Sequence, residues 1–472
     1  MPDLFYIVFF FALGACIGSF LNVVVWRLPR GESLVTPPSR CPICSTRLAW
    51  YDNVPVLGWL MLRGRCRYCH TPISAEYPTI EFITGSLFAF YYVMFFMAGA
   101  GLCWFELRTD PVFGDLRPSH AHVQTIREHW PQYLLAVFTV SALLAASLID
   151  ARNFFIPQSI PICLAVVGLA YHAVLDRPGQ PGALNLKSGA AGAIAVGGAI
   201  GLAISWGLVR TGKLKRSFAD GWPQLEIDKE PVQEEEPKPT WVNRLIDAFR
   251  RRLAPEQARS LDKAQRAAKV RDAQEMAIRE KEFLAKHPEA ANAPVVKEFS
   301  RADIRREIRK EMAFLLPPMM LAIAAAAVVM FVPSVGRRWS VLLAENHWLS
   351  GLLGSVLGGL VGALIVWLTR ILGSLAFGRE AMGMGDVDLM LGVGAVVGAG
   401  ASAVAFFVAP FFGLAIAVYM ILFGRRRELP YGPYLGLGTA FVMLYYCPIA
   451  AYLAPGLGVL KAIVSRSMGA GS

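Results

Sequence analysis

Long apolar stretches recur along this chain and constrain its fold more than any other feature. A membrane-spanning helix needs about 17–25 predominantly apolar residues. The sequence predicts about ten such spans, near residues 4–26, 80–99, 133–149, 157–174, 189–209, 313–333, 350–376, 387–399, 401–423 and 431–454. Of the 472 residues, 55% are hydrophobic and 17% are charged, whereas soluble proteins are nearer a quarter charged. We therefore expect an all-α polytopic membrane protein.

The distribution of arginines predicts the orientation in the bilayer. The segment 27–79 carries Arg27, Arg30, Arg40, Arg47, Arg63, Arg65 and Arg67. Cytoplasmic loops are enriched in such residues, so this segment is expected in the cytoplasm and the N-terminus outside. The first span is then a retained anchor rather than a signal peptide, because the basic residues follow it. This bias also explains most of the net charge of +11, and without a nucleic-acid motif we expect no nucleic-acid binding.

Two aspartates lie at the ends of predicted apolar helices. They are Asp150 in Ser147-Leu148-Ile149-Asp150 and Asp386 in Gly383-Met384-Gly385-Asp386. A carboxylate beside hydrocarbon is costly and usually marks function. Alternating spans place both on the cytoplasmic side, where they can meet. The sequence therefore predicts an aspartic protease dyad. The alternatives are a helix-end residue facing water for Asp150 and a helix cap for Asp386.

Two close carboxylates can share one proton, so that one activates water while the other protonates the leaving amide nitrogen. Asp386 is expected to begin a helix, where the dipole favours the charged form. Asp150 is expected to end one, where the protonated form is favoured. We therefore expect Asp386 to be the resting base and Asp150 the resting acid.

Four of the cysteines form two C-x-x-C pairs, Cys41 with Cys44 and Cys66 with Cys69. Such paired spacings are close to those of four-cysteine zinc sites, in which two tight turns direct four thiolates at one ion. Two disulfides are the alternative, but the cytoplasm keeps thiols reduced. The sequence predicts a structural site for zinc, with another soft metal as the alternative, that holds together a loop with few apolar residues. His70 adjoins the site and is expected to be a surface residue.

Several short motifs occur in one order along the chain, and their order resembles the type IV prepilin leader peptidase family. They are Gly18-Ser19-Phe20-Leu21-Asn22-Val23-Val24, the four-cysteine loop, Ile73-Ser74-Ala75-Glu76-Tyr77-Pro78 with Glu81, Leu148-Ile149-Asp150 with Ile156-Pro157, Gly383-Met384-Gly385-Asp386, and Pro430-Tyr431-Gly432-Pro433. The resemblance covers about 1–174 and 350–455.

The resemblance implies an aspartic endopeptidase of the bacterial cytoplasmic (inner) membrane. Its substrates would be precursors of type IV pilins or type II secretion pseudopilins, from which it removes a short basic leader. It also implies N-methylation of the new N-terminus with S-adenosylmethionine, an activity that accompanies the cysteine-bearing region. The chain departs from the family pattern at Gln158, at Asp388 and in a large insert near 189–333.

These observations predict a series of segments along the chain. They are a first transmembrane helix (1–27), a cytoplasmic four-cysteine loop (28–79), spans that carry the first aspartate (80–174), an inserted helix pair (189–333) around a charged cytoplasmic segment (210–312), C-terminal spans (350–455) and a tail (456–472).

The insert carries no recognisable catalytic motif. Its basic amphipathic stretch at 241–253 fits either an anionic membrane surface or a solvated helix. The similarity of 188–209 to 350–368 fits either a partial duplication or shared Gly/Ala-rich composition.

A non-enzymatic function is the remaining alternative. Transporters also carry intramembrane carboxylates, and a zinc knuckle also suits a secretion-system scaffold. Transporter sites lie near the midplane, whereas both aspartates are predicted at one edge. This placement favours chemistry on a substrate that arrives from the cytoplasm.

Overall fold

A computed structural model gives the arrangement of most of the chain. It describes residues 2–41, 43–97, 122–176, 183–186, 188–215, 217–218, 301–378, 380–422 and 430–445, with Ile449 and Tyr452. The predicted amphipathic stretch at 241–253 and the tail at 456–472 lie outside the described residues.

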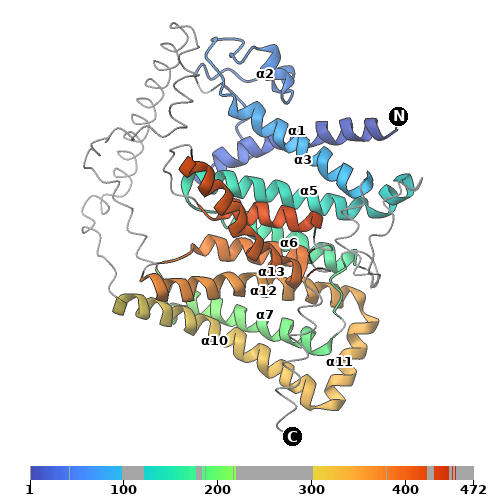
Figure 1. Cartoon of the computed structure of the whole chain (residues 1–472), viewed down its shortest axis with the longest axis vertical. Helices are drawn as coiled ribbons and strands as arrows, with labels where there is room; N and C mark the ends of the chain where they lie inside the picture. The colour runs from blue at the N-terminus through green and yellow to red at the C-terminus, as the bar shows by residue number, and fades with distance from the viewer. Residues whose placement is uncertain are drawn as a thin grey trace.

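The described part is built from helices (Figure 1). They are α1 (Pro2–Arg27), η1 (Leu28–Arg30), η2 (Trp50–Asn53), α2 (Leu57–Met61), α3 (Glu76–Tyr92), the π-helical turn η3 (Val93–Met97), α5 (His122–Asn153), α6 (Ser159–Val174), α7 (Gly189–Arg210), α10 (Arg301–Phe331), α11 (Pro333–Glu345), α12 (His347–Phe377) and α13 (Met384–Leu422). A further helix covers 432–445.

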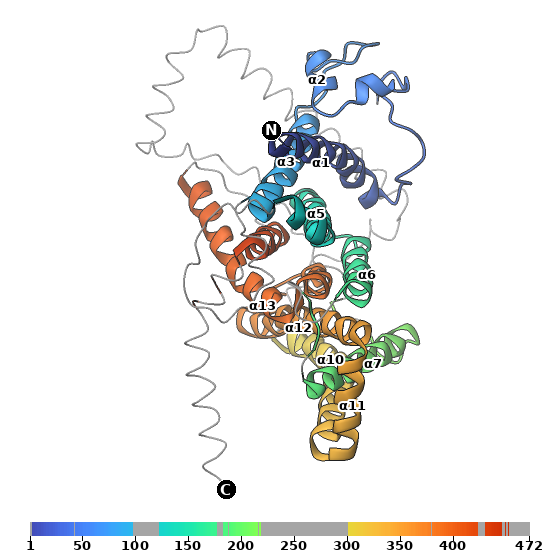
Figure 2. The ribbon, with the colours of Figure 1, turned by 90° about the vertical axis from the view of Figure 1, so that its right-hand side faces the viewer.

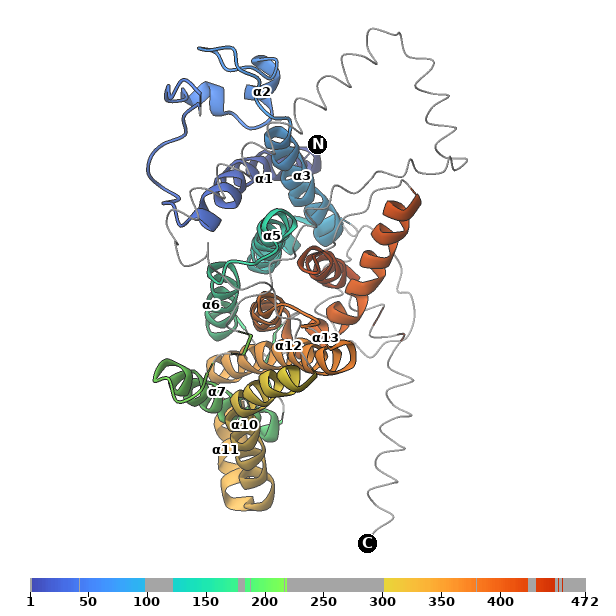
Figure 3. The same ribbon diagram turned by 90° about the vertical axis from the view of Figure 1, so that its left-hand side faces the viewer.

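The helices lie side by side along the long axis of the molecule. Figure 2 shows α1, α3 and α5 towards one end of this axis, α12 and α13 in the middle, and α7, α10 and α11 towards the other end. The opposite view gives the same order (Figure 3). Helix α10 begins at one end of the bundle, and helix α11 runs across the opposite end (Figure 1).

Seven of the described helices are long and apolar enough to cross a membrane, and α6 is a shorter apolar helix. The expected all-α polytopic fold is confirmed. The predicted spans 387–399 and 401–423 fall within α13, where Gly398 breaks the helix with φ 82°. Only glycine adopts this backbone conformation without strain, so the apolar run is bent there into two helices.

The structure differs from the sequence prediction at one helix boundary and in one additional helix. Helix α10 begins at Arg301, before the predicted start of the span at 313, so the end of the charged segment predicted at 210–312 is continuous with the spanning helix. Helix α11 was not predicted, because its Arg337 and Arg338 interrupt the apolar pattern. Its Leu343 is nevertheless buried in a small cluster with Ala195 of α7 and Leu353 of α12.

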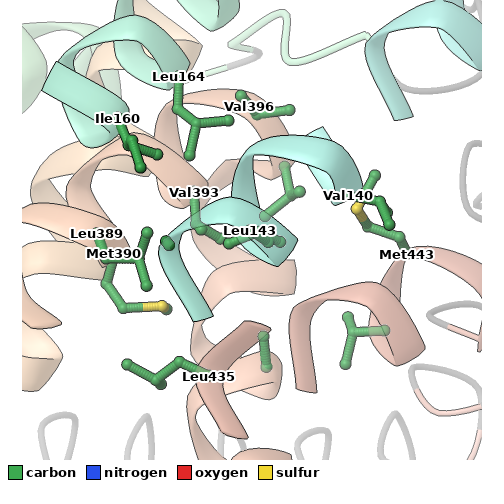
Figure 4. Packing of buried hydrophobic residues seen from close by; sticks show 14 of the residues in the cluster. Val140, Leu143, Ile160, Leu164, Leu389, Met390, Val393, Val396, Leu435 and Met443 are labelled. Atoms are coloured by element: carbon green, nitrogen blue, oxygen red, sulfur yellow. The ribbon is translucent and has the colours of Figure 1, made fainter. Parts of the chain in front are cut away.

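The main core includes residues of α5, α6, α13 and the helix at 432–445, together with residues of α1, α3, α10 and α12. Figure 4 shows Leu143 of α5, Leu164 of α6, Val393 of α13 and Leu435 of the last helix within this cluster. Small residues also allow close helix packing in membranes. A Cβ atom on Gly394 of α13 would clash with the backbone of α12. This core brings the end of α5 and the start of α13 together.

Candidate active site and metal centre

Asp150 lies in the last turn of α5 and is 6% exposed. The helix ends three residues later, and Phe154 closes it with φ 55° and an N–H donated to the Asp150 carbonyl oxygen at 2.8 Å. Asp150 Oδ2 accepts a hydrogen bond from the Gly432 N–H at 3.1 Å. The segment that opens the last helix therefore holds the first predicted catalytic residue.

Asp386 lies in the first turn of α13 and is 8% exposed. Ile156 connects it to the Asp150 site. A Cβ atom on Gly385 would lie 3.2 Å from Ile156 Cβ, and one on Gly432 would lie 3.1 Å from Ile156 Cδ1. The Asp150 carboxylate acts electrostatically on Asp386. Residues from three distant parts of the sequence thus bring the two aspartates together.

The two single-residue departures from the family pattern are in contact with each other. The Gln158 side-chain amide donates a hydrogen bond to Asp388 Oδ2 at 3.5 Å. Gln158 follows the Ile156-Pro157 turn, and Asp388 lies two residues after Asp386. The Gln158 amide therefore gives the additional acid a neutral hydrogen-bond donor.

Sequence reasoning missed two residues beside the dyad. Gly432 was noted only as part of a motif, yet its backbone N–H contacts Asp150. Arg370 was overlooked although it lies inside an apolar span, which is itself a signal of function. Its side chain is 2% exposed, its charge acts on Asp386, and it donates a hydrogen bond to the Met382 carbonyl oxygen at 3.0 Å.

The four predicted metal-ligating cysteines form one cluster. The sulfur atoms of Cys41, Cys44, Cys66 and Cys69 all lie within 4.8 Å of one another. The Sγ atoms of Cys41 and Cys69 are 3.7 Å apart, far beyond a disulfide bond. Tetrahedral ligands at the usual Zn–S distance lie about 3.8 Å apart. The four thiols thus fit a tetrahedral ion and argue against disulfides.

The two C-x-x-C turns have nearly the same backbone geometry. Cys41 N–H donates to Thr46 O and Ser45 N–H to Cys41 O, at 3.0 and 2.9 Å. In the second turn, Cys66 N–H donates to Thr71 O and His70 N–H to Cys66 O, at 2.9 and 3.0 Å.

Ser45 and His70 occupy the same place in the two turns, each with φ 57°. His70 is therefore the turn residue equivalent to Ser45, and it is exposed. This agrees with the expectation of a surface histidine.

Hydrogen bonds favour the thiolate, which is the form that binds metal, at two of the four cysteines, whereas burial and the neighbouring thiols raise the pKa of the Cys69 thiol to about 11. The side chain and backbone of Thr46 lower the pKa of the Cys44 thiol to about 6. The backbone N–H groups of Cys69 and Tyr68 lower the pKa of the Cys66 thiol.

Polar contacts attach the cysteine loop to the helical bundle. Glu81 of α3 is 9% exposed and accepts a hydrogen bond from the Val56 N–H at 2.7 Å. Asn22 of α1 donates to the Tyr77 carbonyl oxygen at 3.2 Å. Glu76 at the start of α3 pairs with Arg152 at the end of α5 at 2.9 Å. The loop therefore joins the bundle at the end where Asp150 lies.

Comparison with known proteins supports these assignments in part. Residues 12–95 match the family described as bacterial peptidase A24 N-terminal domain. A prepilin leader peptidase/N-methyltransferase of Myxococcus xanthus is 40% identical over 172 residues, which cover 36% of this chain and 42% of that protein. A protein of the same name from Klebsiella pneumoniae is 49% identical over 86 residues, covering 17% and 38%.

A third relative is a type 4 prepilin-like proteins leader peptide-processing enzyme of Escherichia coli, 35% identical over 164 residues, covering 31% of this chain and 49% of that protein. No solved structure matches. The chain spans about half the length of the curated relatives it matches. The resemblance read from the motifs is confirmed: the matched parts of this chain are similar to the prepilin leader peptidase/N-methyltransferase family.

Proposed function

We propose that this chain is a membrane aspartic endopeptidase that removes the basic leader from type IV prepilins or type II secretion pseudopilins. The observation that carries the proposal is the meeting of buried Asp150 and Asp386 around Ile156 and Gly432. Two carboxylates in one water-poor site can share a proton and so supply a base and an acid at the same pH.

In this mechanism Asp386 takes a proton from water as the water attacks the scissile carbonyl carbon. Asp150 gives its proton to the leaving amide nitrogen. Asp150 Oδ2 already accepts the Gly432 N–H, so the proton of the neutral acid is carried by Oδ1. The two residues exchange roles as the tetrahedral intermediate collapses, and only the apparent pKa values of the pair are measurable.

The cysteine cluster is proposed to hold one structural zinc ion through Cys41, Cys44, Cys66 and Cys69. The spacing of the sulfurs and the lowered pKa of the Cys44 thiol support it. Bound zinc would hold the two turns together without taking part in proteolysis.

N-methylation of the new N-terminus with S-adenosylmethionine is proposed from the names of the relatives. The match of residues 12–95 to a bacterial peptidase A24 N-terminal domain supports this proposal, because the matched residues include the cysteine-bearing region.

The site is proposed to face the cytoplasm from the inner membrane. The arginines of 27–79 favour this side, and the Arg152–Glu76 contact joins that segment to the end of α5. A transporter would be expected to place its carboxylates near the bilayer midplane. Here they lie at the end of α5 and the start of α13, which favours the peptidase.

The direct test is to incubate the purified protein with a set of pilin-like precursor peptides and to read the products by mass. We expect one cut at the end of the basic leader, and a further 14 Da on the new N-terminus when the methyl donor is present (about the mass of one added methylene). Intact peptides after incubation with properly folded protein would refute the peptidase proposal.

A further inference from the structure

A buried polar network connects the inserted helix pair to the loop before Asp386. Glu311 of α10 and Arg370 of α12 are each 2% exposed and pair at 2.8 Å, from Arg370 Nε to Glu311 Oε1. The other two Arg370 nitrogens engage the loop, since one donates to the Met382 carbonyl oxygen at 3.0 Å and the other pairs with Glu380 at 2.8 Å. A single guanidinium thus joins α10 to the segment 380–382.

The Glu311 carboxylate is held by donors on both oxygens. Oε1 accepts from Arg370 Nε and from Ser217 Oγ, at 2.8 and 2.9 Å. Oε2 accepts from Trp367 Nε1 at 3.1 Å. The Trp367 ring stacks on Phe314 of α10 at 5.1 Å between centroids. The carboxylate is therefore fixed in one orientation, and a guanidinium bound to it is fixed as well.

We propose that Glu311, which is contributed by the inserted helix α10, is a positioning residue that sets the loop before Asp386 by orienting Arg370. The geometry gives two links: Arg370 holds the loop at Glu380 and Met382, and Glu311 holds Arg370. The Arg370 charge also acts on Asp386 and Asp388. The inserted pair is thus part of the machinery that places the catalytic carboxylate, although it supplies no catalytic group.

The catalytic consequence rests on the proposed peptidase function, whereas the positioning can be measured without it. Glu311→Gln keeps the size of the side chain but replaces one acceptor oxygen by an N–H₂ donor. Because Arg370 and Trp367 offer only N–H donors, one of them then faces another donor. In either orientation of the amide, Arg370 loses the charge of its partner on α10, and one of the two donors loses its acceptor. The loop that Arg370 holds therefore gains freedom.

The positioning is tested by hydrogen–deuterium exchange on purified full-length protein. In Glu311→Gln we expect exchange in a peptide covering 378–386 to rise about tenfold, without a matching rise in peptides of α7. Arg309→Gln is the control, because it removes one charge from the same turn of α10 at an exposed position. Unchanged exchange at 378–386 in folded Glu311→Gln protein would overturn the inference, as would an equal rise throughout the bundle.

Trp367→Phe keeps the test decisive if Glu311→Gln does not fold. It deletes the N–H donated to Glu311 Oε2 and retains an aromatic ring against Phe314. We expect a smaller rise in exchange, confined to the same peptide. If exchange in this peptide did not rise at all, the proposal would be contradicted.

Cleavage kinetics test the catalytic consequence of the proposed positioning. Misplacing a catalytic group by about 1 Å costs up to about 100-fold, so kcat for a precursor peptide should fall about 10- to 100-fold in Glu311→Gln, with KM within about twofold. A rise in KM at unchanged kcat would contradict positioning of the catalytic carboxylate. If the wild-type protein cut no peptide, the proposed function would fail, while the exchange experiment would still decide the coupling of α10 to the loop.

Discussion

Gly432 offers the sharpest test of the dyad geometry, because one added methyl group acts directly on Asp150. A Cβ atom at this position would lie 2.5 Å from Asp150 Oδ2, whereas ordinary contacts begin near 3.4 Å. Relieving the clash requires the carboxylate to move by up to 3.4 − 2.5 = 0.9 Å. The same movement breaks the 3.1 Å hydrogen bond from the Gly432 N–H.

The expected effects of Gly432→Ala on activity and on stability differ in size. A displacement near 1 Å at a catalytic group costs about 100-fold, so kcat for a precursor peptide should fall by that order. Overpacking costs about 1–3 kcal/mol, and alanine recovers about 0.5–1 kcal/mol over glycine within a helix. The loss of global stability should therefore be small, and a thermal melt in detergent should show a folded protein.

The matched control is Gly413→Ala. Its added Cβ would lie 3.4 Å from Tyr434 Cδ2, which is an ordinary contact with the same last helix. We expect near-wild-type cleavage from this variant. If Gly432→Ala also cleaved at a rate within about threefold of wild type, the site would tolerate displacement of Asp150, and the proposed dyad geometry would be wrong.

Four further changes test the rest of the proposal. Asp150→Asn and Asp386→Asn should each lower peptide cleavage by about 10³-fold or more, because a neutral amide cannot exchange the proton; cleavage by either folded variant at the wild-type rate would remove that residue from catalysis. Cys66→Ser should lower zinc, measured by elemental analysis, from about one ion per chain and impair methylation more than cleavage, because the aspartates lie elsewhere; wild-type zinc content would exclude Cys66 as a ligand. Replacing 221–300 by a short flexible linker should leave the rate of cleavage of a soluble peptide within about threefold of the wild-type rate. If the deletion variant inserted correctly into the membrane but had no activity, this segment would belong to the enzyme.

The deletion stops at residue 300 for a reason that only the structure provides. Ile304 and Ile308 of α10 are 2% and 3% exposed and belong to the main core. Removing buried side chains of this size costs about 2–5 kcal/mol each. This burial could not be predicted from the sequence, because these isoleucines stand among arginines, lysines and glutamates that are typical of a solvated segment.

Apolar length and motif spacing were sufficient to predict the helical membrane fold and both candidate sites. A span needs a long apolar run wherever it lies in the bundle, so the runs themselves locate helices such as α5 and α12. The C-x-x-C turns were equally predictable, because each forms its own hydrogen bonds within a few residues. Interactions between residues close in the sequence therefore determine these features, and such interactions can be predicted from the sequence.

Contacts between distant segments could not be read in this way. Gln158 and Asp388 looked like two separate departures from the family pattern, yet they form one hydrogen bond. Helix α11 was not predicted, because it is short and carries two arginines, but packing of Leu343 against α7 and α12 gives it a buried face. In each case a partner far away in the sequence supplies the stabilising contact.

Arg370 and Glu311 show how such a partner could have been sought. An arginine within an apolar span cannot stay unpaired at a buried position, because desolvation of an isolated charge is too costly. The loop acid Glu380 gives it one partner, but the Nε side of the guanidinium still faces α10, where a second carboxylate meets it. The extra helix pair therefore adds the charge that completes the surroundings of a core arginine. An insert that supplied only a peripheral anchor would have no need to bury a glutamate there, and this argues that the pair and the catalytic loop form one structural unit.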